Sequence, residues 1–91
     1  MIFEWDEAKR TGNLAKHGVD FEDVRAFDLV AAIRSLDVRR DYGETRWRAT
    51  GSIGGRLHVL VFTWRGESIS VISLRNANHL KVAAYETETH S

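Results

Sequence analysis

The sequence predicts a small α+β domain in which two N-terminal helices and one C-terminal helix pack on a four-stranded antiparallel sheet. Three observations predict this class. Apolar residues in the first 30 positions have helical spacing between capping residues, residues 31–75 alternate with a period of two, and helical spacing returns after Asn76. The 91 residues form one domain, 1–91, because a chain of this size supports a single hydrophobic core.

The composition excludes several classes of protein. The chain has no cysteine, which excludes disulfides, thiolate metal sites and cysteine nucleophiles. Hydrophobic residues make up 43% of the sequence, too many for a generally disordered chain. No apolar run approaches the roughly 20 residues of a membrane span, and the N-terminus has no signal-peptide pattern. We therefore expect a cytoplasmic protein without a membrane partner.

The first helix is predicted from its two ends. Asp6 is a good N-cap, and Glu7 lies in the first turn, where the helix dipole favours an anion. Lys16 and His17 place cations in the last turn, and Gly18 can adopt the left-handed conformation that ends many helices. These signals predict a helix over 7–17.

The second helix is predicted to begin after Asp20, another N-cap residue. Phe21, Val24 and Phe27 are spaced by three and would form its apolar stripe. The C-terminal helix is predicted from the spacing of Ala77, Leu80 and Ala84, with Asn76 or Asn78 as its cap; these two residues remain alternatives.

Four strands are predicted: a first short strand that contains Ile33 and Leu36 after the extended period begins at Ala31, and strands at residues 45–53, 56–64 and 68–75. Hairpin turns are expected at Gly54-Gly55 and around Gly66. The strand 56–64 is apolar on both alternating faces, which predicts that it is central in the sheet. The expected core consists of Phe3, Phe21, Val24, Phe27, Ile33, Trp47, Leu57, Val59, Val61, Ile69, Val71 and Leu80.

The net charge of zero conceals a basic middle segment. Residues 31–75 carry 8 basic and 4 acidic side chains, a net charge of +4, and all the cations are arginine. The guanidinium fork of arginine suits phosphate, so the segment is a candidate nucleic-acid footprint. The alternative interpretation is a solvated face of the sheet.

Polar side chains line one stripe of the first helix. Lys9, Asn13 and His17 are spaced by four, and Lys16 follows Asn13 by three. Gly12 and Asn13 are poor residues for the middle of a helix, each costing up to about 1 kcal/mol relative to alanine, which suggests that another requirement fixes them. The stripe is either a phosphate-binding surface or simply a wet helix face.

His17 is the best candidate for acid–base chemistry, because imidazole titrates near neutrality and the neighbouring Lys16 would lower its pKa. Its alternative role is to stabilise the helix dipole as a cation. The other histidines, His58, His79 and His90, share no metal-ligand spacing, so we expect neither a metal nor another cofactor.

Cleavage of RNA without a metal needs a base near the 2′-hydroxyl, a cation for the phosphorane and an acid for the leaving oxygen. The chain contains these residue types. Our candidate catalytic residues are His17, Lys16, Arg46, Arg75 and Tyr85. Our candidate RNA-binding residues are Lys9, Asn13, Arg48 and Arg65. Trp47 and Trp64 would either stack on bases or belong to the core.

The sequence also resembles the BrnT family of bacterial type II toxins over nearly its whole length. The resemblance rests on Phe3-Glu-Trp-Asp6, Lys9, Asn13, Lys16-His17-Gly18-Val19, Phe21-Glu22, Arg46-Trp47, Gly51, Ile72-Ser73, Arg75, Ala77 and Tyr85-Glu86. It implies a RelE-like ribonuclease that arrests translation by cutting RNA. It also implies a BrnA-type ribbon-helix-helix antitoxin, and a complex that binds promoter DNA only through that antitoxin.

The chain departs from the family pattern near its C-terminus. Lys81 stands where the pattern has glutamate, and Val82 stands where it has arginine. If these positions contribute to cleavage, this member would be impaired. The alternative function is therefore an interaction module that binds the antitoxin and regulates its own transcription.

Overall fold

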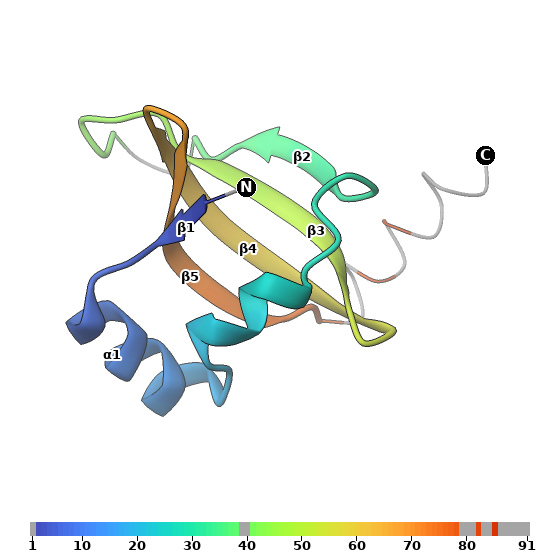
Figure 1. The fold of residues 1–91 in the computed structure, drawn as a ribbon. Helices are drawn as coiled ribbons and strands as arrows, with labels where there is room; N and C mark the ends of the chain where they lie inside the picture. Colours follow the sequence, from blue (N-terminus) through green and yellow to red (C-terminus); the bar gives the residue numbers. More distant parts are fainter. Residues whose placement is uncertain (1, 39–40, 79–81, 83–84, 86–91) are drawn as a thin grey trace.

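A five-stranded mixed sheet forms the body of the protein, in the order β1-β5-β4-β3-β2 (Figure 1). The computed structural model describes residues 2–38, 41–78, 82 and 85. Its elements are β1 (Ile2–Glu4), α1 (Glu7–His17), the 3₁₀ helix η1 (Phe21–Ala26), β2 (Ile33–Leu36), β3 (Trp47–Ile53), β4 (Arg56–Arg65) and β5 (Ser68–Asn76). The α+β class is confirmed, but the expected numbers of strands and helices are not.

The sheet corrects the predicted four-stranded antiparallel arrangement. Ile2–Glu4 forms a strand that pairs in parallel with Ser68–Ser70 of β5. Three residues are too few to show a period of two, so this strand could not be predicted from periodicity. The other pairings, β2 with β3, β3 with β4 and β4 with β5, are antiparallel as predicted. β4 lies in the middle of the sheet, as its apolar residues indicated.

α1 has the predicted bounds and caps. The Asp6 carboxylate accepts hydrogen bonds from the backbone N–H groups of Ala8 at 2.7 Å and Lys9 at 3.3 Å. Gly18 has φ 70°, and its N–H donates to the carbonyl of Leu14 at 2.9 Å. This left-handed residue ends the helix and turns the chain towards η1.

The second helix is a 3₁₀ helix of six residues, which corrects the expected α-helix. Asp20 caps it as predicted, because its carboxylate accepts from the N–H of Glu22 at 3.0 Å. Phe27 is already extended, and so short a segment commonly adopts 3₁₀ geometry. Of the expected C-terminal helix, Val82 donates its N–H to the Asn78 carbonyl at 3.0 Å, while Leu80 and Lys81 lie outside the described residues.

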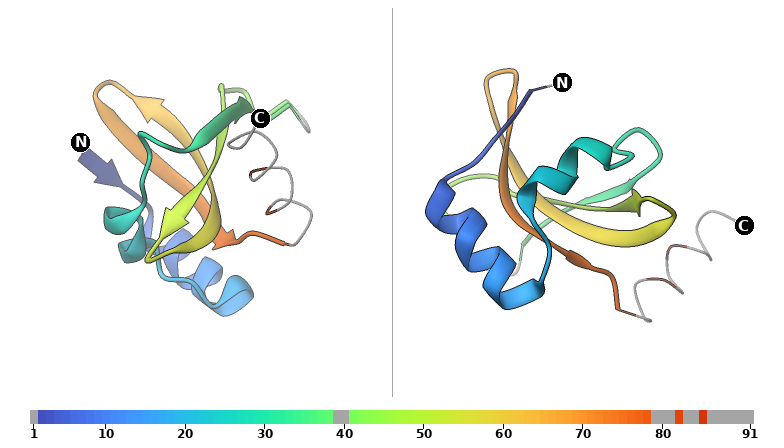
Figure 2. Two further views of the ribbon diagram at one scale, coloured as in Figure 1. Left: turned by 90° about the vertical axis from the view of Figure 1, so that its right-hand side faces the viewer. Right: turned by 60° about the horizontal axis from the view of Figure 1, so that its bottom comes forward.

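η1 covers one face of the sheet, and α1 lies alongside β5 (Figure 2). The core lies between η1 and this face of the sheet, and it contains Val19, Phe21, Val24, Phe27, Leu29, Ala49, Leu60, Phe62, Ile69, Val71 and Leu74. Val59 and Val61 are also buried, whereas Ile33, Trp47, Leu57 and Phe3 are only partly buried. The predicted core was therefore wrong chiefly in that it included Leu57, which is only partly buried, and left out Leu60, Phe62 and Leu74, which are buried.

A bulge in β5 explains part of this error. Val61 pairs with Ser73, but the next residue, Phe62, pairs with Val71, so Ile72 is an extra residue in β5. Before the bulge Val71 faces the core, and after it Leu74 does. The alternation of β5 therefore changes phase, and this decides which side chains reach the opposite face of the sheet.

Candidate active site

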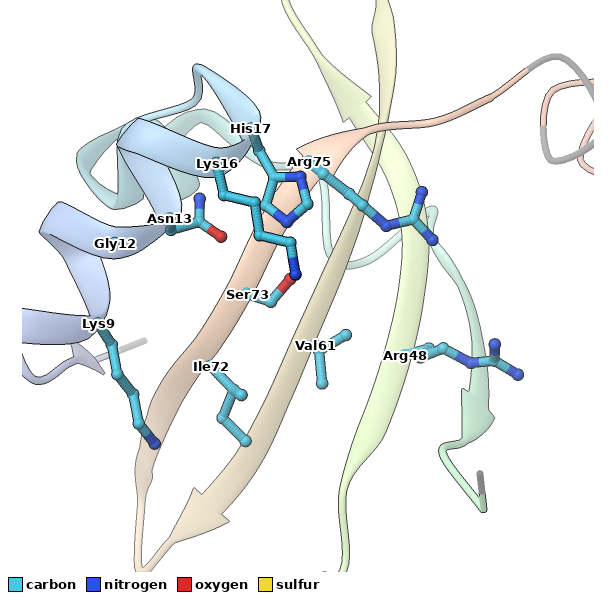
Figure 3. Close-up of a pocket in the computed structure, with 10 residues that line it drawn as sticks. All are labelled: Lys9, Gly12, Asn13, Lys16, His17, Arg48, Val61, Ile72, Ser73 and Arg75. Carbon is cyan, nitrogen blue, oxygen red and sulfur yellow. The ribbon is translucent and has the colours of Figure 1, made fainter. Parts of the chain in front are cut away.

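A cleft of about 420 Å³ lies between α1 and the face of the sheet opposite the core (Figure 3). Its walls come from α1 on one side and from β3, β4 and β5 on the other. The lining residues are Lys9, Gly12, Asn13, Lys16, His17, Arg48, Val61, Ile72, Ser73 and Arg75. The structure thus brings together six of the nine site residues predicted from the sequence.

The helical period places the polar stripe of α1 on this cleft. Lys9, Lys16 and His17 extend from the helix towards the sheet (Figure 3). The caps at Asp6 and Gly18 fix the two ends of the helix that carries them. Both lysines are exposed and His17 is partly buried. The stripe therefore forms one wall of this cleft.

Asn13, which we predicted to bind RNA, is buried and bonded to the protein backbone. Its amide nitrogen donates to the carbonyls of Val19 at 2.9 Å and Leu74 at 2.7 Å, and its oxygen accepts from the N–H of Leu74 at 3.2 Å. Only 7% of the residue is exposed. Asn13 therefore fixes α1 to β5, and this explains why a poor helix former stands in the middle of α1.

Asn13 acts where β5 lacks a neighbouring strand. β1 pairs with β5 only over Ser68–Ser70, so none of the described strands pairs with Leu74 on that side. The Asn13 amide supplies a donor and an acceptor to Leu74, as a neighbouring strand would. This contact sets the distance between the helix wall and the sheet wall of the cleft.

The bulge in β5 places Arg75 in the cleft. Without the extra residue Ile72, Arg75 would follow the alternation of Ile69 and Val71 towards the core. With it, Ile72, Ser73 and Arg75 all line the cleft. Ile72, Ser73 and Val61 were not among the predicted site residues. The family phrase contains Ile72-Ser73 together with Arg75, so it could have indicated two of them.

Arg48 and Arg75 complete the sheet wall. Arg48 lies opposite Val61 in the register of β3 and β4, and Arg75 lies opposite Val59, so the two arginines occupy successive rows on the same face. The Nε atom of Arg48 is buried and has no hydrogen-bond partner within the described part of the chain. A bound acceptor, such as a phosphate oxygen, would satisfy the guanidinium here.

The charges in the cleft are of one sign. Lys9, Lys16, Arg48 and Arg75 supply four cations, and the described residues that line the cleft include no carboxylate. A cleft lined by one sign of charge concentrates ligands of the opposite sign. The site is therefore suited to an anionic ligand with several negative groups.

His17 stands beside these cations. Burial lowers the pKa of the His17 imidazole below 6.5, and the positive charges of Lys16 and Arg75 lower this pKa further. The direction predicted from Lys16 is confirmed, although burial is the larger cause. The lowered pKa favours the neutral form of His17 at pH 7, and a neutral imidazole can accept a proton.

Three predicted site residues do not line the cleft. The Arg46 Nε donates to the Glu44 carboxylate at 3.2 Å, and its guanidinium lies 4.0 Å from the centre of the Tyr42 ring. Arg65 lies 3.9 Å from Glu44 and lines a neighbouring pocket with Lys9. Tyr85 is partly buried and lines neither the cleft nor this neighbouring pocket. Arg46 precedes β3, so its face could not be inferred from strand alternation.

The tryptophans are also separate from the cleft. Trp64 packs edge-on against Phe62 with 6.0 Å between ring centres, and Trp47 lines a small pocket with both. In the parts of the chain that the structure describes, no cluster of three or more His, Asp or Glu side chains could hold a metal ion. No helix among these residues is long and apolar enough to cross a membrane.

Comparisons with known proteins agree with the resemblance noted in the sequence. A family model described as "Ribonuclease toxin, BrnT, of type II toxin-antitoxin system" matches residues 5–80. The 1.1 Å crystal structure of the Brucella abortus ribonuclease toxin BrnT is 32% identical in sequence, with a TM-score of 0.66. That match covers 87% of this chain and 100% of the Brucella chain. No match was found among curated proteins. The chain belongs to the BrnT family of ribonuclease toxins from type II toxin–antitoxin systems.

Proposed function

We propose that this chain is an active endoribonuclease toxin that cleaves RNA without a metal ion and thereby inhibits translation. The observation that carries the proposal is the position of His17 in a cleft with four cations. A neutral imidazole can move protons, and the cations can stabilise the charge that develops on a phosphate. The relation to RelE-like ribonucleases remains a prediction.

The reaction that fits these groups is attack by the ribose on its own phosphate. His17 accepts the proton of the 2′-hydroxyl, and the 2′-oxygen forms a bond to the adjacent phosphorus. The bond from phosphorus to the 5′-oxygen breaks, and Lys16 donates a proton to that oxygen. The products are a 2′,3′-cyclic phosphate and a 5′-hydroxyl. Arg48 and Arg75 stabilise the negative oxygens of the intermediate state.

The donor set of the cleft supports a reaction without a metal. Divalent magnesium and calcium prefer carboxylate and carbonyl oxygens, whereas the side chains that face this cleft are largely cationic. Four positive charges would repel a divalent cation and attract the phosphates of RNA. Arginine and lysine here supply the positive charge that a metal supplies in other nucleases.

We propose a BrnA-type ribbon-helix-helix antitoxin as the partner, with promoter DNA bound only through the antitoxin. A type II toxin requires an antitoxin, and a segment with acidic residues would complement the cleft. Arg48→Glu and Arg75→Glu are expected to weaken the complex and make its affinity less dependent on salt. Normal antitoxin binding by both variants, together with lost RNA cleavage, would place inhibition on another surface.

The cleavage experiment uses purified protein and RNA in the presence of EDTA. We expect wild-type protein to produce cyclic-phosphate and 5′-hydroxyl ends and His17→Ala to be at least about 100-fold slower. Arg25→Ala is a suitable control, because Arg25 lies on η1 away from the cleft and pairs with Glu22. The proposal fails if expression is harmless and RNA stays intact both with and without ribosomes.

A further inference from the structure

Gly12 is an exposed residue in the middle of α1, and it lines the cleft. Glycine is among the least favourable residues in a helix interior, since it costs more backbone entropy than any other residue. Such a residue needs a reason for its place in the helix.

The described part of the chain shows no such reason. A Cβ atom built at Gly12 would meet nothing within 4 Å, so none of the described neighbours needs the space. Its φ angle is not positive, in contrast to the five glycines in turns and caps. Gly51 differs, because a Cβ atom there would lie 2.9 Å from the Phe27 ring. The space over Gly12 is therefore free for a ligand.

The surroundings of this space suggest what the ligand is. Lys9 precedes Gly12 by three residues and Lys16 follows it by four, so both lie on the same stripe of the helix (Figure 3). The two ammonium groups therefore flank a bare segment of helix backbone. Across the cleft, the apolar side chains of Val61 and Ile72 line the sheet wall. A phosphate bonded to a small uncharged group would suit a space with lysines on one wall and apolar side chains on the other.

We propose that Gly12 is the contact point for the sugar–phosphate backbone of single-stranded RNA, with one phosphate held between Lys9 and Lys16. This inference rests on the proposed ribonuclease function. The ribose lies directly against the helix, where a side chain would displace it, and the lysines neutralise the phosphate. The cleft volume of about 420 Å³ is that of a site for a small molecule, which favours a single nucleotide unit over a duplex.

The test measures binding and stability together. The probe is a short single-stranded RNA whose 2′-hydroxyls are replaced by fluorine, so that it cannot be cleaved by the proposed reaction. We expect Gly12→Ala to weaken binding by about tenfold and Gly12→Leu by more, while Gly12→Ala raises the thermal midpoint. Thr11→Ala is the control: Thr11 is exposed on α1 and does not line the cleft, so binding should not change.

The possible outcomes separate this inference from the proposed function. Unchanged binding by a folded Gly12→Leu variant overturns the role of Gly12, even if the wild-type protein cleaves RNA. Graded loss of binding across the Gly12 series supports that role, even if His17→Ala shows that the chemistry was wrongly assigned. Absence of binding to the probe by the wild-type protein overturns the inference as well.

Discussion

The side-chain amide of Asn13 completes the backbone hydrogen bonds of Leu74, donating to its carbonyl at 2.7 Å and accepting from its N–H at 3.2 Å. This pairing joins α1 to an uncovered part of β5. Since α1 carries Lys16 and His17 and β5 carries Arg75, one buried side chain sets the relative positions of the residues that we propose for catalysis.

The first prediction follows from this pairing. Asn13→Ala leaves the backbone groups of Leu74 and the Val19 carbonyl without their amide partner in a buried place, which should cost about 3 kcal/mol of unfolding free energy. Urea denaturation measures this loss. Lys9→Ala, a change on the same helix face but at an exposed residue, should cost less than about 0.5 kcal/mol. Equal stability of the two variants would show that the pairing is dispensable.

The second prediction concerns pH and His17. Its pKa is lowered in the folded protein by burial and by Lys16 and Arg75, so the unfolded chain binds a proton first as pH falls. The contribution of His17 to stability is therefore full above pH 6.5 and decreases as pH falls from 6.5 towards the lowered pKa. NMR titration should place the midpoint below 6.5.

The activity should follow the same group. If His17 acts as the base, RNA cleavage should decline on the acid side with the midpoint that NMR gives. Arg75→Met should raise this midpoint without bringing it to the ordinary value, because burial remains. A midpoint that is the same in the variant would contradict the electrostatic part of this account.

The third prediction concerns the contact between α1 and η1. Arg10 binds Asp20 through two parallel hydrogen bonds of 2.8 and 3.0 Å. The guanidinium of Arg10 lowers the pKa of Asp20 to about 2, from an ordinary value of 3.8. The contribution of the Arg10–Asp20 contact to the stability of the fold is present above pH 3.8 and is lost as pH falls towards 2.

Acid denaturation tests this contact. Asp20→Asn should lower stability at pH 7 and flatten the pH dependence between 3.8 and 2. Glu22→Gln is the matched control, because Glu22 pairs with Arg25 on the exposed side of η1. An unchanged acid transition in Asp20→Asn would rule out the carboxylate as its source.

Local chemistry explains which elements were predictable. Asp6, Gly18 and Asp20 cap helices through hydrogen bonds to backbone groups only a few residues away in the sequence. The bounds of α1 and the start of η1 could therefore be inferred from the sequence. β1 was missed because its partner, Ser68–Ser70, lies near the other end of the chain. The stripe on α1 was predictable for the same local reason, but the role of Asn13 depends on the distant Leu74.

The sheet wall of the site was predictable only in part. Arg48 follows the alternation of β3, so its face could be inferred from the pattern. Arg75 reaches the cleft because of the bulge at Ile72, which packing decides and no short motif announces. Arg46 lies outside the regular strand and its Nε donates to Glu44, so the alternation of β3 could not predict its position.

The fourth prediction compares Arg48, which lines the cleft, with Arg46, which does not. Arg48→Met should reduce RNA cleavage by at least about 100-fold, because it removes a cation from the phosphate site. It should not reduce stability, since it also removes a buried Nε atom that lacks a partner among the described residues. Arg46→Met should leave the cleavage rate within about threefold of wild type. Equal loss of activity in both variants would mean that the ligand extends beyond the cleft.

The last prediction concerns the two departures from the family pattern, Lys81 and Val82. Val82 is not among the residues that line the cleft, and Lys81 lies outside the described residues. If the chain is an active toxin, growth arrest on expression should be the same for wild type and for a Lys81→Glu/Val82→Arg variant. The measurement is growth after induction in a bacterium without the antitoxin, with His17→Ala in both backgrounds as the control. Toxicity only in the double variant would instead favour the interaction module, because the family residues would then be needed to assemble the cations and His17 into a working site.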